Sequence, residues 1–266
     1  MMTTLTRSLL SAVPCLIAAA FTSSAHAATV YNVNFGSGSF EIDATDQYKG
    51  AATEADAAGN GDVTWNNFGG DTNGALAGAQ ALVNSTGDGS AGVTMTITPP
   101  ATQSAAVGGN SNIASADNIF GGWIKTNGNA LEFNIALSGL STTATYDLLI
   151  YSDWRWGHNG VDQRVTLTAG SGLAGTYYVT TGDHPTSSPP SGLTPDTNPA
   201  EGATSDSNAN YSRISGLSAD GSGVLAFDTS GRNTPLSGFQ LVEVPEPSSL
   251  ALLSLGGLCM LRRRRA

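Results

Sequence analysis

The densest group of side chains that could recognise a ligand lies at residues 154–159, with the sequence Trp-Arg-Trp-Gly-His-Asn. Indole faces stack on the apolar C–H faces of pyranose sugars, and Arg, His and Asn side chains hydrogen-bond sugar hydroxyls. Ligand-binding residues concentrate on loops that a rigid scaffold holds in place. The pattern therefore predicts a carbohydrate-binding loop. Its expected contact residues are Trp154, Arg155, Trp156, His158 and Asn159.

The same segment also fits a purely structural role. Alternation along a strand would send Trp154 and Trp156 into the core and leave Arg155 in solvent. Buried aromatic side chains are ordinary in β-sandwiches. Trp65 and Trp123 are further candidates for sugar stacking, and for these a core position is the stronger expectation. From the sequence, both roles of the 154–159 segment stay open.

Motifs for catalysis are scarce, and no residue is assigned as catalytic. The chain has no G-x-S-x-G elbow and no H-E-x-x-H motif. Residues 170–175 satisfy G-x-G-x-x-G, but they lead into the strand-like segment 176–179, where a dinucleotide site needs a helix. A glycine-rich hairpin is predicted there instead. Asp153 and Asp162 are the first carboxylate pair to inspect for glycoside hydrolysis.

No metal ligand and no cofactor are assigned either. Glu41, Asp43 and Asp46 cluster, and Asp88 sits in a turn-like context, so these carboxylates could offer oxygen ligands to a structural Ca²⁺. However, the chain has no calcium-loop motif, and Asp and Asn are common in turns for local reasons. A zinc site is poorly supported, because residues 28–244 contain two histidines and no cysteine.

The elements that must position these residues are short β-strands. Leu131, Phe133 and Ile135 alternate with polar or small residues, as in a half-buried strand, and residues 146–151 are apolar on both faces, as in a central strand. The candidate strands are 29–35, 93–98, 131–137, 146–151, 165–167, 177–179, 224–227 and 239–244. A short helix is conceivable only at 72–83, and residues 137–141 and 214–218 are interpreted as two similar turns. The sequence predicts an all-β protein, a jelly-roll-like antiparallel β-sandwich.

Both ends of the chain have the features of export segments. Arg7, the apolar run 9–21 and the small residues Ala25 and Ala27 predict a signal peptide that is cleaved after Ala27. At the other end, an apolar run at 250–261 precedes four arginines. As a helix this run would rise about 18 Å, which is short of the roughly 30 Å hydrocarbon core of a membrane. Arginines favour the cytoplasmic side, so the body of the chain is expected outside the inner membrane.

The order Pro245-Glu246-Pro247, apolar segment and basic end resembles the PEP-CTERM sorting signal. Gram-negative bacteria that export proteins into an extracellular polysaccharide matrix use this signal. The resemblance implies that an exosortase, a membrane cysteine peptidase, recognises Pro245, Glu246 and Pro247 and processes the chain near them. It also implies a transient C-terminal anchor, followed by delivery to the cell surface or matrix.

Short motifs in the body resemble a group of uncharacterised exported PEP-CTERM proteins with galactose-binding-like jelly-roll bodies. These motifs are Val33-Asn34-Phe35-Gly36, Tyr48-Lys49-Gly50-Ala51-Ala52, Thr64-Trp65-Asn66, Leu137-Ser138-Gly139-Leu140 with Thr145-Tyr146-Asp147-Leu148, and Gly238-Phe239-Gln240-Leu241. The resemblance implies the same jelly-roll fold for this chain.

Composition sets further limits on function. The expected organisation is a signal peptide at 1–27, a β-sandwich domain at 28–244 and a sorting and anchor segment at 245–266. Of 11 basic residues, Arg7 and the four C-terminal arginines lie in the export segments, as does Glu246 of the 21 acidic residues, which leaves 6 basic against 20 acidic residues in 28–244, a balance near −14. Such an acidic chain is not expected to bind nucleic acid. Both cysteines, Cys15 and Cys259, lie in the export segments, so the domain has no disulfide.

Three functions follow as hypotheses. The leading one is a non-catalytic surface or matrix protein that binds carbohydrate through residues 154–159. A second is a polysaccharide-active hydrolase or lyase, and a third is a purely structural matrix protein. The expected partners are the secretion machinery, an exosortase-type membrane peptidase and extracellular polysaccharide.

Overall fold

The computed structural model describes residues 28–36, 64–68, 78–99, 105–109, 122–126, 131–152, 161–172, 176–181, 195, 211–231 and 236–244. These ranges all fall within one compact unit, Ala28–Val244. The predicted signal peptide and the predicted C-terminal hydrophobic helix lie outside the described residues.

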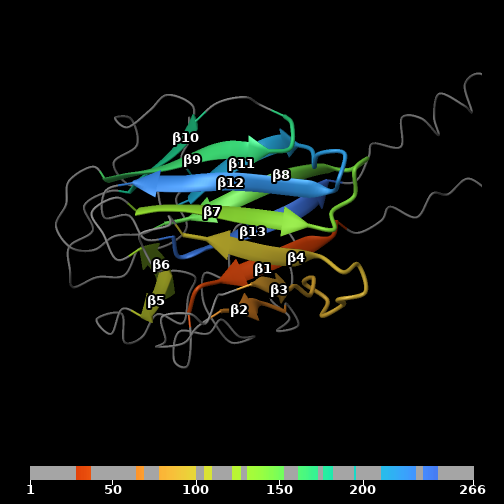
Figure 1. Ribbon diagram of the computed structural model, residues 1–266, viewed down its shortest axis with the longest axis horizontal. Helices are drawn as coiled ribbons and strands as arrows, with labels where there is room; N and C mark the ends of the chain where they lie inside the picture. The colour runs from red at the N-terminus through yellow and green to blue at the C-terminus, as the bar shows by residue number, and fades with distance from the viewer. Residues whose placement is uncertain are drawn as a thin grey trace, which may run out of the picture. The chain divides into compact units, whose positions relative to one another are not determined.

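Two main sheets make up the described fold (Figure 1). A five-stranded sheet has the order β11-β8-β13-β1-β2, a six-stranded sheet has the order β10-β9-β12-β7-β4-β3, and β5 and β6 form a ribbon. The strands are β1 (Val30–Asn34), β2 (Asn66–Asn67), β3 (Ala79–Ala81), β4 (Thr94–Thr98), β5 (Ala105–Gly109), β6 (Gly122–Thr126), β7 (Leu131–Ser138), β8 (Thr145–Tyr151), β9 (Val161–Ala169), β10 (Thr176–Thr181), β11 (Tyr211–Leu217), β12 (Val224–Gly231) and β13 (Gly238–Val244). All pairings between these strands are antiparallel except β1 with β2. The predicted all-β, jelly-roll-like antiparallel β-sandwich is confirmed.

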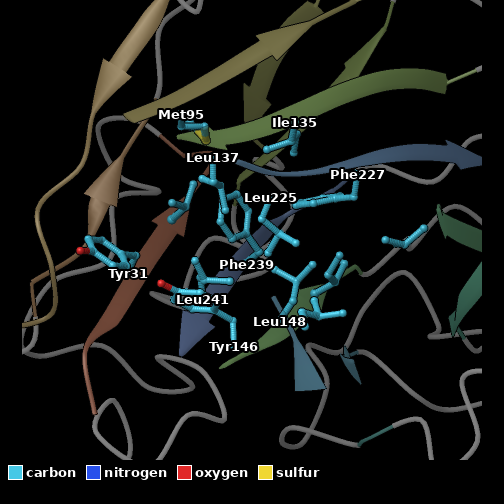
Figure 2. Close-up of a cluster of buried hydrophobic side chains, with 14 of the residues drawn as sticks. Tyr31, Met95, Ile135, Leu137, Tyr146, Leu148, Leu225, Phe227, Phe239 and Leu241 are labelled. Carbon is cyan, nitrogen blue, oxygen red and sulfur yellow. The ribbon is translucent and has the colours of Figure 1, made fainter. Parts of the chain in front are cut away.

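The core lies between the inner faces of the two sheets, because period-two alternation sends apolar side chains from each sheet to the same layer. Figure 2 shows this cluster, with Met95, Ile135, Leu137, Leu225 and Phe227 from the six-stranded sheet. The rings of Phe227 and Phe239, one from each sheet, meet edge to face with their centroids 5.9 Å apart. Phe239 also packs on Phe35 of the chain after β1, at 6.4 Å. Phe239 therefore joins the two layers.

Strand β8 has buried side chains from Tyr146 to Tyr151, which confirms the prediction of a central strand that is apolar on both faces. It lies between β11 and β13. Burial, and then the nearby charge of Glu243, raise the pKa of Tyr146 to about 12. The Tyr146 hydroxyl donates a hydrogen bond to the carbonyl oxygen of Ser141 at 3.2 Å.

Two local expectations are corrected. Residues 79–81 form the edge strand β3 and not a helix, because they pair with β4; residues 72–77 lie outside the described part. The two supposed similar turns also differ. Gly139 turns the chain after β7, whereas Gly216 lies inside β11, where the pairing register with β8 shifts. The glycine-rich hairpin is confirmed, since Gly170 and Gly172, both with positive φ, lie between the antiparallel strands β9 and β10.

No helix among the described residues is long and apolar enough to cross a membrane.

A buried side-chain amide holds the segment after β3 against β1 and β2. Asn66 donates through Nδ2 to the carbonyl oxygens of Asn32, at 2.9 Å, and Val83, at 2.7 Å. Its Oδ1 accepts the N–H of Val83 at 2.9 Å. The amide thus pairs with Val83 as a neighbouring strand would, and Asn66 is only 9% exposed.

Further amides form a buried chain on the outer face of the five-stranded sheet. Gln240 of β13 donates through Nε2 to Oδ1 of Asn32 at 2.7 Å, and its Oε1 accepts a hydrogen bond from the Tyr151 hydroxyl at 2.5 Å. All three residues are fully buried. These three polar side chains on the outer face are therefore closed to solvent, and their hydrogen bonds hold β8, β13 and β1 in register.

Candidate functional site

The predicted carbohydrate-binding residues Trp154, Arg155, Trp156, His158 and Asn159 lie outside the described residues, so their role stays a prediction. The described chain ends before this segment at Ser152, directly after β8, and resumes at Val161, the first residue of β9. Strand β8 belongs to the five-stranded sheet and β9 to the six-stranded one. The predicted loop therefore follows the first sheet and precedes the second.

A row of polar residues crosses the outer face of the six-stranded sheet. The row consists of Thr98 of β4, Asn134 of β7, Asp228 of β12, Thr166 of β9 and Thr176 of β10, each the direct pairing partner of the next. Residues directly opposite each other in antiparallel strands lie on one face. The residues beside them in β7 and β12 belong to the core, so the row faces outward. We call these five residues the polar row.

Hydrogen bonds fix the middle of the polar row. Asn134 donates through Nδ2 to Oδ1 of Asp228 at 2.8 Å and to the hydroxyl of Thr168 at 2.9 Å. The hydroxyls of Thr166 and Thr176 lie 3.2 Å apart. Within the described residues, Oδ2 of Asp228 and Oδ1 of Asn134 make no hydrogen bond. Both oxygens are therefore positioned acceptors that can take a donor from a ligand.

A depression of about 400 Å³ lies over the row. It is lined by Thr98, Pro99, Phe133, Asn134, Thr166, Asp228 and Ser230. Asp228 is the single ionisable residue in this lining, and it is exposed. The lining combines hydroxyl, amide and carboxylate oxygens with an apolar part of similar extent, to which Pro99 and Phe133 contribute. Such a surface can exchange hydrogen bonds with a polyhydroxylated ligand.

The sequence interpretation did not identify this site. A signal for part of it was present, because three threonines alternate with Met95 and Ile97 along β4. Asp228 likewise falls between two buried residues of β12. Alternation shows that such residues share a face within one strand. It does not show which residues of other strands lie beside them. The polar row depends on that information, because the pairing register between strands brings its five residues together.

Other candidates from the sequence have structural roles where they are described. Trp65 is 7% exposed, so its expected core position is confirmed. Asp88 accepts hydrogen bonds from the N–H and the hydroxyl of Ser90, both at 2.8 Å, and these bonds lower the pKa of its carboxyl. Asp88 is thus a turn residue. The described residues contain no group of three His, Cys, Asp or Glu side chains that could hold a metal ion.

An ion pair in which two guanidinium nitrogens donate to one carboxylate oxygen joins β8 and β11. Arg213 donates through Nε to Oδ2 of Asp147 at 2.9 Å and also through Nη2, while Oδ1 of Asp147 accepts the N–H of Gly216 at 3.2 Å. The carboxylate is nearly buried and the guanidinium is about half exposed. This pair secures the irregular end of β11 and leaves little of the carboxylate available for a ligand.

Both ends of the described unit leave the sandwich at the same place. Val30 pairs with Val242, and the N–H of Glu243 donates to the carbonyl oxygen of Thr29 at 2.7 Å. On the other side of β13, Val244 pairs with Thr145. We call this place the exit end. Three turns belong to it: residues 84–92 between β3 and β4, residues 139–144 between β7 and β8, and residues 218–223 between β11 and β12.

Comparisons with known proteins identify the C-terminal segment. Residues 243–265 match the family model described as the PEP-CTERM protein-sorting motif. The match includes Pro245, Glu246 and Pro247, which lie outside the described residues. The motif indicates export, sorting through a membrane-anchored C-terminus and processing by an exosortase. No curated protein matches the chain.

Two solved structures resemble the body at a distance. One is TmCBM61 in complex with β-1,4-galactotriose, with a TM-score of 0.31 and 9% identity over 56% of this chain and 83% of that chain. The other is the enzymatically active domain of bacteriophage CBA120 tailspike protein 4, with a TM-score of 0.28 and 8% identity over 57% of this chain and 19% of that chain. Neither similarity assigns a ligand or an activity to this chain.

Proposed function

We propose that this exported protein acts at the cell surface or in the extracellular matrix as a non-catalytic binder of a neutral polysaccharide. The proposal rests on one observation, which is the polar row beneath the depression of about 400 Å³. The sorting motif supplies the route out of the cell. After cleavage of its signal peptide at Ala27, the β-sandwich would be held by residues 245–266 and then delivered.

The chemistry of the row fits sugar hydroxyls. Asp228 and Asn134 present acceptor oxygens, and the threonine hydroxyls both donate and accept. Neighbouring strands lie about 4.8 Å apart, so a row across five strands extends about 19 Å, which suits several sugar units of an extended chain. The formal net charge of the chain is −10, which disfavours an anionic polysaccharide.

The predicted loop at 154–159 would extend this surface. Strand β9 begins at Val161, directly after the loop, and reaches the polar row at Thr166. Trp154 and Trp156 would add indole faces to the lining, whose one aromatic residue is Phe133, while Arg155, His158 and Asn159 would add hydrogen bonds. We therefore treat the row and the loop as two parts of one proposed site.

One observation favours the alternative, a polysaccharide hydrolase. Glu132 of β7 pairs with Ser230 of β12, one pair along from Asn134 and Asp228. The positions of Glu132 and Asp228 are thus diagonal neighbours, about 7 to 8 Å apart in an antiparallel pair. Glycoside hydrolases hold two carboxyl groups about 5 to 9.5 Å apart, and an Asp and a Glu on diagonal positions of two paired strands can reach such a spacing. This alternative predicts the release of reducing ends, which binding alone does not produce.

Binding is tested with purified Ala28–Val244 and the extracellular polysaccharide of the producing organism. We expect saturable binding of the wild type. We expect Asp228→Ala to weaken the affinity at least about tenfold, because one charge-assisted hydrogen bond and the anchor of Asn134 are lost. Thr145→Ala, an exposed polar residue of the other sheet, is the matched control and should bind as the wild type does.

The outcomes separate the three functions. Loss of binding in Asp228→Ala supports the polar row, and a further loss in Trp154→Ala/Trp156→Ala supports the loop. Reducing ends released by the wild type, and not by Glu132→Gln, would establish the hydrolase. A folded wild type that neither binds nor cleaves the polysaccharide would contradict the proposal and leave the structural matrix role.

Sorting is tested in the producing cells. Replacing Pro245, Glu246 and Pro247 by alanine should leave the full-length protein in the inner membrane, because the processing peptidase loses its recognition residues. Fractionation followed by immunoblotting measures the released fraction. Release at the wild-type level would show that these residues do not direct sorting.

A further inference from the structure

The folded sandwich and the sorting motif are joined without a spacer. Strand β13 stays paired with β8 up to Val244, and the family match begins at residue 243, inside the strand. Only residues 245–249 separate the last paired residue from the apolar run that starts at Leu250. Five extended residues span at most about 17 Å. Because β13 is hydrogen-bonded to strands on both sides, it cannot lengthen this tether without breaking the sheet.

This short tether brings the exit end close to the membrane whenever the apolar run is inserted. The headgroup region takes up about 5 to 7 Å of the available length. One helix with its side chains is already about 10 Å across. A peptidase that encloses Pro245–Pro247 therefore has to touch the surface around Val244. We infer that the exit end of the sandwich is a docking surface for the membrane peptidase that processes the tail, an inference that rests on the sorting role of the motif.

The exit end has the rigidity that such a surface needs. A Cβ on Gly139 would lie 2.8 Å from the carbonyl oxygen of Gly92, and a Cβ on Gly223 would lie 2.6 Å from that of Leu140. Both glycines have positive φ, so a side chain would be strained there in any case. The N–H of Leu140 also donates to the carbonyl oxygen of Gly223 at 3.0 Å. The turns around 92, 139–144 and 218–223 are thus packed backbone against backbone.

The charge of these turns favours a protein partner over the lipid surface. Residues 84–92, 139–144 and 218–223 contain Asp88 and Asp220 but no lysine or arginine, and Glu243 ends the adjacent strand. Anionic headgroups repel such a surface. A partner with basic or hydrogen-bond-donating groups complements it. Exposed hydroxyls at Thr142 and Ser222 lie on the same turns and offer places to change its charge without changing the backbone.

The test uses the full chain in cells that contain its processing peptidase, with the half-time of tail removal measured by pulse-chase. We expect Thr142→Arg/Ser222→Arg to slow processing about tenfold or more, because two bulky cations face a partner that is complementary to an acidic surface. A flexible Gly/Ser spacer of about 12 residues inserted between Val244 and Pro245 should restore the rate in this variant, since the sandwich then no longer has to contact the peptidase. Pro195→Arg, exposed beside the start of β11 at the opposite end, is the matched control and should be processed normally.

Each other outcome overturns the inference. Unchanged processing of the arginine variant, or slow processing that the spacer does not relieve, would show that the exit end makes no contact. Faster processing would mean that the added arginines attract anionic lipid and that this surface faces the membrane. Protease resistance of the variant in isolated membranes controls for misfolding. A wild-type tail that is never removed would overturn the sorting role as well, whereas loss of polysaccharide binding would leave the docking surface untouched.

Discussion

Replacing Asn66 by aspartate is expected to lower the free energy of unfolding by about 3 to 5 kcal/mol at neutral pH. The Nδ2 group of Asn66 donates to the carbonyl oxygens of Asn32 and Val83. A carboxylate at this position would place an oxygen where a donor is required, opposite two acceptors and largely out of water. The variant loses two hydrogen bonds and gains two repulsive contacts. The loss of unfolding free energy is measured by urea unfolding, with tryptophan fluorescence as the readout.

The effect of Asn66→Asp should depend on pH. Only the protonated carboxyl can donate to one of the two carbonyl oxygens, so the folded state raises the pKa of this group above its usual value near 3.9. The folded variant therefore holds its proton at pH values where the unfolded chain has released it. Its stability relative to the wild type falls as the pH rises from about 4 towards neutrality.

Asn84→Asp provides the matched control for this prediction. Oδ1 of Asn84 accepts hydrogen bonds from the N–H and hydroxyl of Thr86, at 3.0 and 2.7 Å, and from the N–H of Asp88 at 2.9 Å, and a carboxylate at this exposed turn accepts these bonds equally well. We expect a change within about 1 kcal/mol. Equal losses in the two variants would contradict the role assigned to the Asn66 amide.

Phe239→Ala is expected to cost about 3 to 5 kcal/mol of unfolding free energy, which is the usual range for a large aromatic side chain in a core. Phe239 is fully buried and contacts Phe227 from the opposite sheet as well as Phe35. Its removal leaves a cavity at the junction of the two sheets. The surrounding strands, which are held by their hydrogen-bond ladders, can fill such a cavity only in part.

Two further measurements locate this effect. Phe239→Leu keeps most of the volume and should cost less than half as much. A double-mutant cycle with Phe227→Ala should show a coupling of about 0.5 to 1.5 kcal/mol, because the two rings touch edge to face. A coupling of zero would mean that the two sheets do not meet through these rings.

Strand alternation was the part of this fold that could be predicted from the sequence. In β7, Phe133, Ile135 and Leu137 all lie in the core, and β8 is buried on both faces as expected. Alternation did not predict a strand that forms through its pairing with a neighbouring strand and has no alternating pattern of its own. Strand β3 consists of Ala79, Gln80 and Ala81, which have no strand preference and become a strand only beside β4.

The burial of polar faces could not be predicted either. In β1, Asn32 alternates with the core residues Tyr31 and Val33. Such alternation usually implies exposure to solvent, but Asn32 is fully buried. Its partner in the amide chain, Gln240, lies 208 residues away in the sequence. The polar row has the same origin, since Asn134 and Asp228 become neighbours only through the register of β7 and β12. Pattern within one strand carries no information on such pairings.

The place of β13 in the five-stranded sheet bears on when the protein can fold. This strand comes last in the sequence of the domain, yet it lies between β1, the first strand, and β8. While residues 238–244 are still on the ribosome or inside the export channel, β1 has no antiparallel neighbour and the core lacks Phe239 and Leu241. Contacts between residues so distant in sequence also form late, because a long loop must close first. We therefore expect the newly made chain to stay in the unfolded state that translocation requires, and to fold only when its final strand has crossed the membrane.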